Sequence, residues 1–131
     1  MKKVFLFVAL LGFITMYISC ALPEKKLQDS GAKLLNQQDL IEFFKEKRVG
    51  KGMTSRGSID IYYFPDRTQK IEHGGGSDEG KYRIDNGQLC VKWKEIRGGA
   101  EKCTRMYHIE GNKYESVYLD GSSAASLTFE E

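Results

Sequence analysis

The chain has 131 residues, with 20 basic and 18 acidic side chains, and 40% of its residues are hydrophobic. This length suits a single domain. It excludes both a doubly wound dinucleotide-binding fold with a substrate domain and an α/β-hydrolase. The composition is that of a globular protein, which excludes wholesale disorder.

The N-terminus has the pattern of a secretory signal. Met1-Lys2-Lys3 is a short positive segment, residues 4–18 carry no charge, and the small residues 19–21 follow. A positive start, an apolar run and small residues at its end are typical of a signal peptide. The apolar run is shorter than the roughly 20 residues that cross a bilayer as a helix. We therefore expect an exported protein with a signal peptide over residues 1–20.

Two alternative cleavage sites are compatible with the sequence at the end of this signal. Tyr17-Ile18-Ser19-Cys20 resembles the lipobox of bacterial lipoproteins, which is cleaved before a cysteine that then carries lipids. Because Tyr17 stands where that motif usually has an aliphatic residue, ordinary cleavage after Ala21 stays open. The cysteine count favours lipidation, because an exported protein that pairs Cys90 with Cys103 leaves Cys20 over. With Ala21 after the lipobox, known sorting rules imply an outer-membrane lipoprotein that faces the periplasm.

The charge balance gives no sign of a nucleic-acid partner. The signal contains Lys2 and Lys3 and no acid, so the mature chain has 18 basic and 18 acidic residues. Basic residues gather between Lys45 and Arg56. We interpret them as the solvated end of a helix, where cations complement the helix dipole, or as a contact for lipid head groups or another anion.

One helix is expected before the strands. Residues 21–35 have weak periodicity, a proline and a glycine, and are interpreted as a tether. Asn36 is a favourable N-cap for an amphipathic helix over residues 37–48, whose apolar stripe runs from Leu40 to Phe44. Gly50 is a natural stop. The aromatic face of this helix has to pack against the domain that follows it.

After Gly50 the pattern is that of short strands separated by turns. Asn86-Gly87 is a strong hairpin signal, because both central residues of a type I′ turn need positive φ. The glycine-rich residues 74–80 are interpreted as a flexible loop. About seven strands are expected, at residues 58–64, 68–73, 81–85, 88–94, 101–109, 113–118 and 124–129.

Seven sequential strands with short turns have to close or fold over to avoid unpaired edges. The prediction is therefore a mainly β single domain over residues 36–131. Its antiparallel meander forms a small lipocalin-like barrel or a two-layer sheet. The N-terminal helix plugs one end of the barrel or packs across its open side.

The cysteine pair tests the connection between two of these strands. A strict two-residue turn at Gly98-Gly99 would leave Cys90 and Cys103 about 13 Å apart, too far for a disulfide. Direct pairing requires a longer loop, around residues 95–100. We favour the disulfide because exported proteins usually oxidise neighbouring cysteines. Two unpaired thiols are the alternative.

No catalytic or metal-binding constellation stands out. His73-Gly74-Gly75-Gly76 is similar to the oxyanion-hole string of some esterases, but no Gly-x-Ser-x-Gly motif accompanies it. The histidines at positions 73 and 108 lack metal-ligand spacing, and Asp78-Glu79 lacks the pattern of a calcium loop. We therefore expect no catalytic residue, no metal and no cofactor.

Aromatic side chains supply the remaining candidates for a binding site. Tyr and Trp combine apolar area with a polar tip, which suits a pocket or a contact surface. The alternative is that they fill the core of the sheet. Three consecutive aromatics at residues 62–64 place rings on both faces of one strand, which makes that strand the preferred contact surface. The candidate binding residues are Tyr62, Tyr63, Phe64, Tyr82 and Trp93.

One ordered motif runs through the second half of the chain. It consists of Gly80-Lys81-Tyr82-Arg83-Ile84, then Leu89-Cys90-Val91-Lys92-Trp93, then Cys103. Together with the leader, it resembles a family of small exported proteobacterial proteins of unknown function. Cores of that family contain Gly-x-Trp/Tyr-x-Ile/Val, a turn with glycine, Leu-Cys-x-x-Trp and a second cysteine. The resemblance covers residues 36–129. It implies a shared fold and an envelope location, and it brings no catalytic residues.

These features predict a non-enzymatic envelope protein that acts by binding. The first hypothesis is a protein-interaction module with another envelope protein as its partner. The alternative is a lipocalin-like carrier of a small apolar ligand, and an enzyme is the third hypothesis. A deep apolar cavity under Trp93 and Tyr82 would favour the carrier, whereas a filled core with an exposed patch at Tyr62 or Phe64 would favour the interaction module. Membrane association is expected only through a lipid on Cys20.

Overall fold

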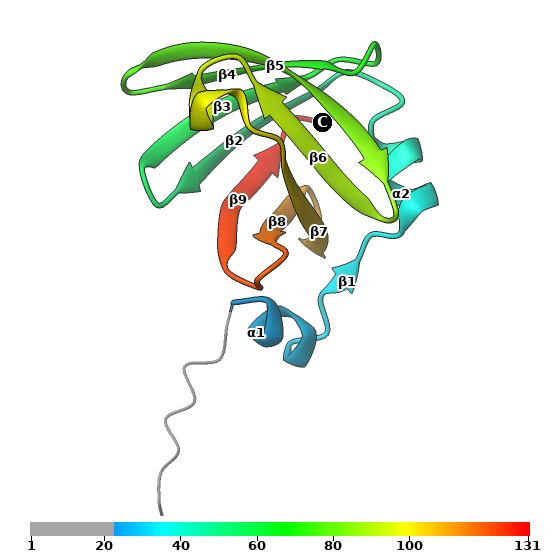
Figure 1. Ribbon diagram of the computed structural model, residues 1–131. Coiled ribbons are helices and arrows are strands. Elements are labelled where there is room, and N and C mark those ends of the chain that lie inside the picture. The colour runs from blue at the N-terminus through cyan, green and yellow to red at the C-terminus, as the bar shows by residue number, and fades with distance from the viewer. Residues whose placement is uncertain (1–22) are drawn as a thin grey trace, which may run out of the picture.

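The structure is a computed structural model that describes residues 23–131 (Figure 1). Its helices are α1 (Pro23–Asp29) and α2 (Gln37–Phe43), and no helix in the described residues is long and apolar enough to span a membrane. A short 3-10 helix, η1, covers Ile96–Gly99. The strands are β1 (Lys33–Leu34), β2 (Arg48–Thr54), β3 (Gly57–Tyr63), β4 (Thr68–His73), β5 (Gly76–Asp85), β6 (Gln88–Trp93), β7 (Lys102–Glu110), β8 (Lys113–Tyr118) and β9 (Ser123–Phe129).

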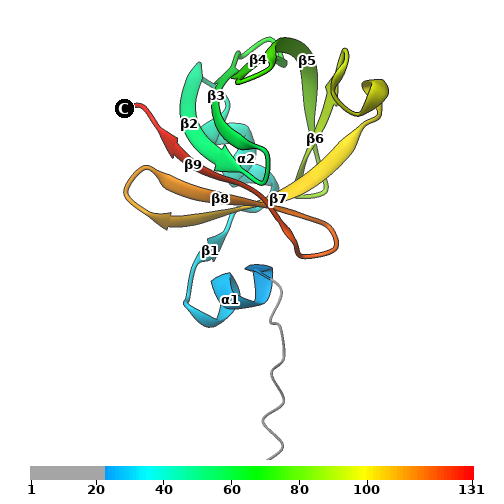
Figure 2. The same cartoon turned by 90° about the vertical axis from the view of Figure 1, so that its left-hand side faces the viewer.

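The strands from β2 to β9 close into an antiparallel barrel. Each pairs with the next along the chain, and β9 pairs back with β2. Figure 2 shows this ring with α2 behind it. A closed sheet has no free edge, which is how a meander of short strands avoids exposed backbone groups. The predicted mainly β, lipocalin-like barrel is confirmed, with eight strands in the ring where about seven were expected.

The barrel strand that the sequence pattern misses is β2. Gly50 and Gly52 weaken the signal for a strand, because glycine has low β-propensity. In the structure both glycines face β9. A Cβ on Gly50 would lie 3.1 Å from the ring of Phe129, and one on Gly52 would collide with the backbone carbonyl of Ser126. Close packing of the two strands therefore requires glycine at these positions.

Strand β5 begins at Gly76, so the expectation of a flexible loop over residues 74–80 is wrong for most of that segment. Strands β4 and β5 stay paired up to His73 and Gly76. Gly80 faces Trp93 on β6, and a Cβ on Gly80 would lie 2.9 Å from the indole. Gly80 leaves room for the indole ring of Trp93, so packing in the sheet explains this glycine and chain flexibility does not.

The part of the expected tether that the structure describes is folded against the barrel. The Glu24 carboxylate of α1 accepts hydrogen bonds from Arg105 Nε at 2.6 Å and Nη2 at 2.7 Å, and from the Tyr107 hydroxyl at 3.0 Å. The Glu24 N–H donates to the Gly121 carbonyl at 3.1 Å. Strand β1 pairs with β7 beyond the residues that pair with β6. Residues 23–35 thus form an arm that is docked on the barrel. Its main contacts are those of Glu24 with Arg105 and Tyr107 on β7, which the periodicity of residues 21–35 cannot indicate.

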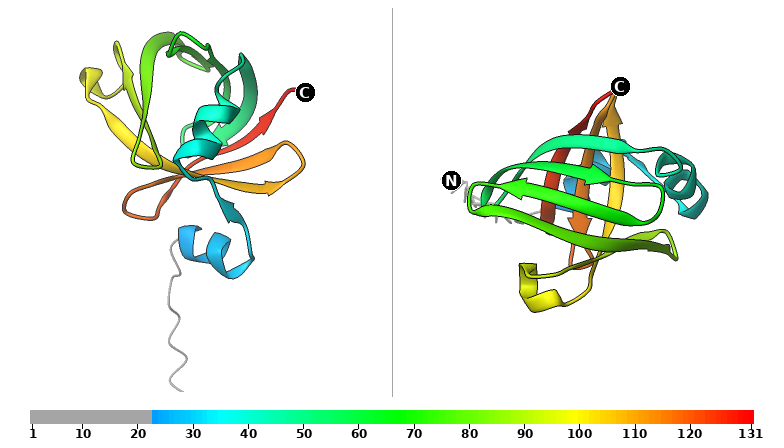
Figure 3. Two further views of the ribbon diagram at one scale, coloured as in Figure 1. Left: turned by 90° about the vertical axis from the view of Figure 1, so that its right-hand side faces the viewer. Right: turned by 90° about the horizontal axis from the view of Figure 1, so that it is seen from above.

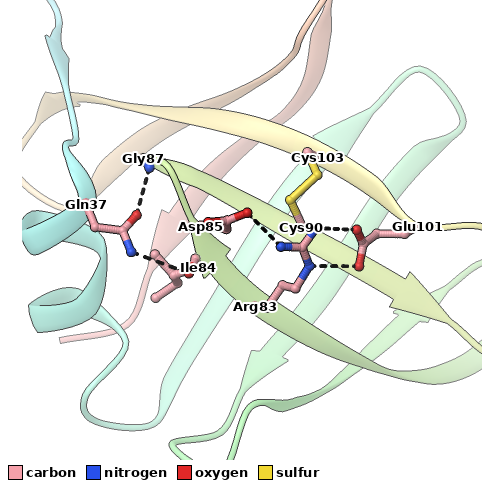
Figure 4. A network of polar contacts seen from close by, with 8 residues as sticks. All are labelled: Gln37, Arg83, Ile84, Asp85, Gly87, Cys90, Glu101 and Cys103. Carbon is pink, nitrogen blue, oxygen red and sulfur yellow. Dashed lines mark hydrogen bonds and ion pairs between the residues drawn. A yellow bond between two sulfur atoms is a disulfide. The ribbon is translucent and has the colours of Figure 1, made fainter.

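Helix α2 covers one end of the barrel (Figure 3). The Asn36 side chain accepts from the Asp39 N–H at 2.8 Å, and the Asp39 carboxylate accepts from the Asn36 N–H at 3.0 Å. Gln37 reaches the β5–β6 turn, where it accepts from the Gly87 N–H at 2.7 Å (Figure 4). The predicted N-cap is correct. The helix ends at Phe43 and not near residue 48, because β2 has already begun there.

The hydrophobic core runs from the end covered by α2, where aromatic rings gather, to the isoleucines and leucines of the barrel wall. Phe44 is 1% exposed, and the centre of its ring lies 4.7 Å from that of Tyr63 and 5.4 Å from that of Tyr82. Leu40 and Met106 are fully buried in the same cluster. Burying one such side chain contributes about 1.5–3 kcal/mol, so this end anchors the fold.

A disulfide joins β6 to β7. Cys90 and Cys103 are register partners, and residues 94–101 connect their strands through η1, so the predicted bond with a longer loop is confirmed. On β5, Arg83 is the register partner of Cys90, and its guanidinium donates to both carboxylate oxygens of Glu101 at 3.1 and 2.7 Å (Figure 4). Covalent and ionic links thus fasten neighbouring strands of one wall.

Candidate functional site

A cavity of about 570 Å³ occupies the barrel, and several residues of the hydrophobic core form its wall. It opens at the end opposite α2, where the turns β2–β3, β4–β5, β6–β7 and β8–β9 form a mouth (Figure 2). Small-molecule sites typically have volumes of about 300–1,000 Å³. The apolar side chains of its wall are Ile59, Ile61, Ile71, Leu89, Val91, Trp93 and Leu127.

Strand alternation turns these side chains inward. Successive residues of a strand point to opposite faces, so every second residue of β3 and β4 lines the cavity. Three facing pairs result: Ile59 with His73, Ile61 with Ile71, and Tyr63 with Gln69. The isoleucine pair gives the middle of the cavity an apolar wall, and a polar pair lies below it toward α2.

The deep end of the cavity is polar but uncharged. Gln69 is 2% exposed, and within residues 23–131 neither its Oε1 nor its Nε2 has a hydrogen-bond partner. An amide buried without partners costs about 1–3 kcal/mol. Burial, and to a lesser extent Tyr82, raises the pKa of the neighbouring Tyr63 hydroxyl, which therefore stays neutral. This end can offer hydrogen bonds, but it offers no charge.

Asp78 shapes one side of the mouth. Its buried carboxylate accepts hydrogen bonds from the N–H groups of Glu95 at 3.0 Å, Ile96 at 2.9 Å and Glu79 at 2.8 Å. Burial alone would raise the pKa of Asp78, but these donors hold it below its ordinary value. The charged carboxylate fixes the start of η1, which carries Ile96 and Arg97 to the rim of the cavity.

The rim is basic. Arg56, His73, Arg97 and Lys102 line it, and no Asp or Glu from the described part of the chain does so. Arg97 Nη2 donates to the Tyr118 hydroxyl at 2.8 Å, and Lys102 Nζ lies 4.2 Å from the centre of the same ring. The cavity therefore has an apolar interior and a positively charged entrance.

The candidate binding residues divide into three groups. Tyr63 and Trp93 line the cavity. Tyr82 lies below it, 5.4 Å from Phe44, with its hydroxyl donating to the Phe64 carbonyl at 2.6 Å. Tyr62 and Phe64 are half-buried and do not line the cavity. The structure thus brings two of the five to one site. A ring on each face of β3 agrees with the predicted alternation.

The predicted cysteine positions have separate outcomes. Cys20, the predicted lipidation site, lies outside the described residues. Cys90, Cys103 and Glu101 come close enough together to resemble a metal site. The two sulfur atoms are bonded to each other, however, and Glu101 is paired with Arg83 at 2.7 Å. A disulfide has no thiolate to offer, so this cluster is structural.

Two parts of the site were missed by reasoning from the sequence. Alternation from Ile61 and Ile71 would have put Gln69 inside the barrel, and a lone glutamine in that row was the available signal. Arg97 and Lys102 had no comparable signal. Arg97 lies in η1 and Lys102 is the first residue of β7, and the course of this connection depends on the buried Asp78.

Comparison with known proteins found no matching family model, no matching curated protein and no matching solved structure. The chemistry of the cavity itself therefore carries the functional inference.

Proposed function

We propose that the barrel is a carrier of a small, largely apolar molecule, which it binds in the cavity above α2. The observation that carries the proposal is the cavity of about 570 Å³ with isoleucine, leucine, valine and tryptophan on its wall. Binding an apolar ligand there removes apolar surface of both partners from water, which stabilises the complex by about 25 cal/mol per Å² buried.

The construction of the barrel supports this reading. The core cluster is filled by aromatic rings at the end covered by α2, whereas its isoleucines, its leucines at positions 89 and 127, and Trp93 line the cavity, so the same core leaves space for a ligand at the other end. The wall beside the mouth is fastened by the disulfide between β6 and β7. A preformed, rigid cavity binds more tightly because less conformational entropy is lost on binding.

The protein-interaction module, our first hypothesis from sequence, has less support. That reading expected a filled core and an exposed patch at Tyr62 or Phe64. Both rings are half-buried, with Lys70 Nζ at 5.8 Å from the Tyr62 ring and Lys47 Nζ at 5.6 Å from the Phe64 ring. We favour the carrier over both the interaction module and an enzyme.

The proposed place of action is the bacterial envelope, as in the exported family that the chain resembles. The basic start, apolar run and lipobox-like Tyr17-Ile18-Ser19-Cys20 support export with a lipid anchor in the outer membrane. An intact-mass spectrum of the protein from native membranes tests this. A diacylated or triacylated start at Cys20 is expected, and an unmodified start at Leu22 would contradict the anchor.

Binding can be followed through Trp93, the single tryptophan of the chain, which lines the cavity. Titration with dodecan-1-ol is expected to change its fluorescence saturably. Ala125→Phe places a ring in the cavity and is expected to abolish this response. The matched control is Thr128→Phe, which adds the same ring at an exposed position of β9 and should bind like the wild type.

Thermal unfolding of both variants shows whether they remain folded. The carrier proposal fails if dodecan-1-ol gives no saturable response with the wild type. It also fails if a folded Ala125→Phe variant binds as tightly as the wild type.

A further inference from the structure

We infer that the ligand of the cavity is an amphipathic molecule with an anionic head group, a carboxylate or a phosphate. The head group lies at the mouth between Arg97 and Lys102, and the apolar chain points inward. This inference rests on the proposed carrier function and adds the chemical class and the orientation of the ligand.

The first argument is the charge at the rim. Arg97 and Lys102 both contact Tyr118 at the edge of the cavity, through a hydrogen bond of 2.8 Å and a cation–π contact of 4.2 Å. Two cations that share one aromatic ring present their positive charge to the same small region. A carboxylate or phosphate placed there would accept charge-assisted hydrogen bonds from both.

The second argument is that these cations have no anionic partner of their own. Residues 23–131 contain every Asp and Glu of the chain, and neither Arg97 nor Lys102 forms an ion pair with any of them. Hydrogen bonds from Ser122, and more weakly the charge of Lys102, lower the pKa of Asp120. The Oδ1 atom of Asp120 accepts two hydrogen bonds from Ser122, at 2.6 and 2.9 Å, and the carboxylate forms no ion pair with Lys102.

The contrast with the outer walls strengthens this argument. There, Arg83 is bound by Glu101 at 2.7 Å and Arg105 by Glu24 at 2.6 Å. Arg83 and Arg105 on the outer walls thus have carboxylate partners, whereas Arg56 and Arg97 at the mouth form no ion pair with any Asp or Glu of residues 23–131.

The orientation follows from the two ends of the cavity. The deep end is lined by the neutral amide of Gln69 and the neutral hydroxyl of Tyr63. The guanidinium of Arg67, whose Nη1 is buried without a hydrogen-bond partner, lies 5.4 Å from the Tyr82 ring and does not line the cavity. A charge placed at the deep end would therefore lose its hydration without direct contact with a cation. At the mouth, the head group keeps contact with water and meets two cations. The apolar chain then lies against Ile61, Ile71 and their neighbours.

The test compares four probes with the same chain and different head groups: dodecanoate, dodecyl phosphate, dodecan-1-ol and dodecyltrimethylammonium. Affinities are measured by Trp93 fluorescence below the micellar concentration of each probe. We expect at least one anion to bind about tenfold more tightly than the alcohol, since hydrogen bonds to charged groups are worth about 1.5–3 kcal/mol. We expect the cation to bind more weakly than the alcohol. The two anionic arms distinguish a carboxylate ligand from a phosphate ligand.

The double variant Arg97→Gln/Lys102→Gln is expected to remove this preference, so that the anions bind no more tightly than dodecan-1-ol. The control Lys81→Gln/Lys92→Gln removes the same charge from exposed positions of β5 and β6 and should keep the preference. Gln69→Leu should keep the preference for the anion over dodecan-1-ol, because the head group does not reach the deep end.

Several results would overturn the inference while leaving the carrier intact. Equal affinity for the alcohol and both anions would do so, as would an anion preference that survives Arg97→Gln/Lys102→Gln or that disappears equally in the control. Loss of the preference for the anion over dodecan-1-ol in Gln69→Leu would show that the head group points inward. If no dodecyl probe binds at all, the carrier proposal itself fails, and this inference fails with it.

Discussion

At the end of the barrel covered by α2, aromatic rings fill the space between the strands, whereas at the mouth the strands enclose a cavity with a basic rim. Phe44 at the first end is 1% exposed and meets Tyr63 and Tyr82 at ring distances near 5 Å. At the second end, Arg97 and Lys102 have no carboxylate partner in the described residues. We therefore expect variants of the packed rings at the first end to affect mainly stability, and variants of the cations at the mouth to affect mainly binding.

The largest loss of stability is expected for Phe44→Ala. Truncating a fully buried phenylalanine removes its packing and leaves a cavity, which costs about 3–5 kcal/mol. Urea unfolding measures the free energy, with Phe64→Ala, a half-buried position, as the control. A loss below about 1 kcal/mol would mean that the covered end does not anchor the fold.

The next largest effect is expected for Cys90→Ser/Cys103→Ser. The bond closes a loop with a sequence separation of 13, and loss of such a constraint costs about 3 kcal/mol in the chain-entropy account. Urea unfolding without reductant measures this loss. The variant should still bind the preferred dodecyl probe under folding conditions, because neither cysteine lines the cavity. Loss of binding in the folded variant would contradict the expectation that the disulfide affects stability and not binding.

Glu24→Gln tests the docked arm and should cost about 2 kcal/mol at neutral pH, since a charged hydrogen-bonded pair is broken. The hydrogen bond from Arg105, opposed by burial and aided by Tyr107, lowers the pKa of Glu24 in the folded state. The stabilisation is therefore complete above the unfolded-state pKa, near 4.5, and is lost as the pH falls through the lowered folded-state pKa. Urea unfolding of both proteins across this range should show the difference between them shrinking on acidification. A difference that does not depend on pH would contradict the ion pair.

The smallest effect on stability, and one of opposite sign, is expected for Gln69→Leu. Replacing an amide that has no partner with an apolar side chain of similar size should stabilise the fold by about 1 kcal/mol. Thermal unfolding of the ligand-free protein measures it, with Gln38→Leu at an exposed position of α2 as the control. Destabilisation by Gln69→Leu would show that ordered water or another group satisfies the amide.

The parts of the fold that local chemistry determines could be predicted. Asn86 and Gly87 have φ values of 56° and 72°, as the hairpin signal requires, and Asn36 caps its helix. The pairing of Cys90 with Cys103 was predicted from the expected export of the protein, and register arithmetic then required the longer loop between them. Each of these depends on residues close in sequence or on a fixed strand rise.

The parts that depend on distant neighbours could not be predicted. Gly50 and Gly52 lack the pattern of a strand, because their role is to admit side chains of β9. Likewise, the docking of Glu24 depends on Arg105, a residue 81 positions away. The mouth combines four turns from separate hairpins, so its charge was visible only once the barrel had closed.

The hydrogen bond from the Glu24 N–H to the Gly121 carbonyl limits the distance between the barrel and a lipid attached to Cys20. Gly121 lies in the β8–β9 turn, one of the turns at the mouth, and Pro23 follows Cys20 by three positions. A chain of three residues reaches at most about 11 Å. If Cys20 carries lipids, this short connection holds the barrel close to the bilayer. The β8–β9 turn of its entrance would then stay near the membrane surface.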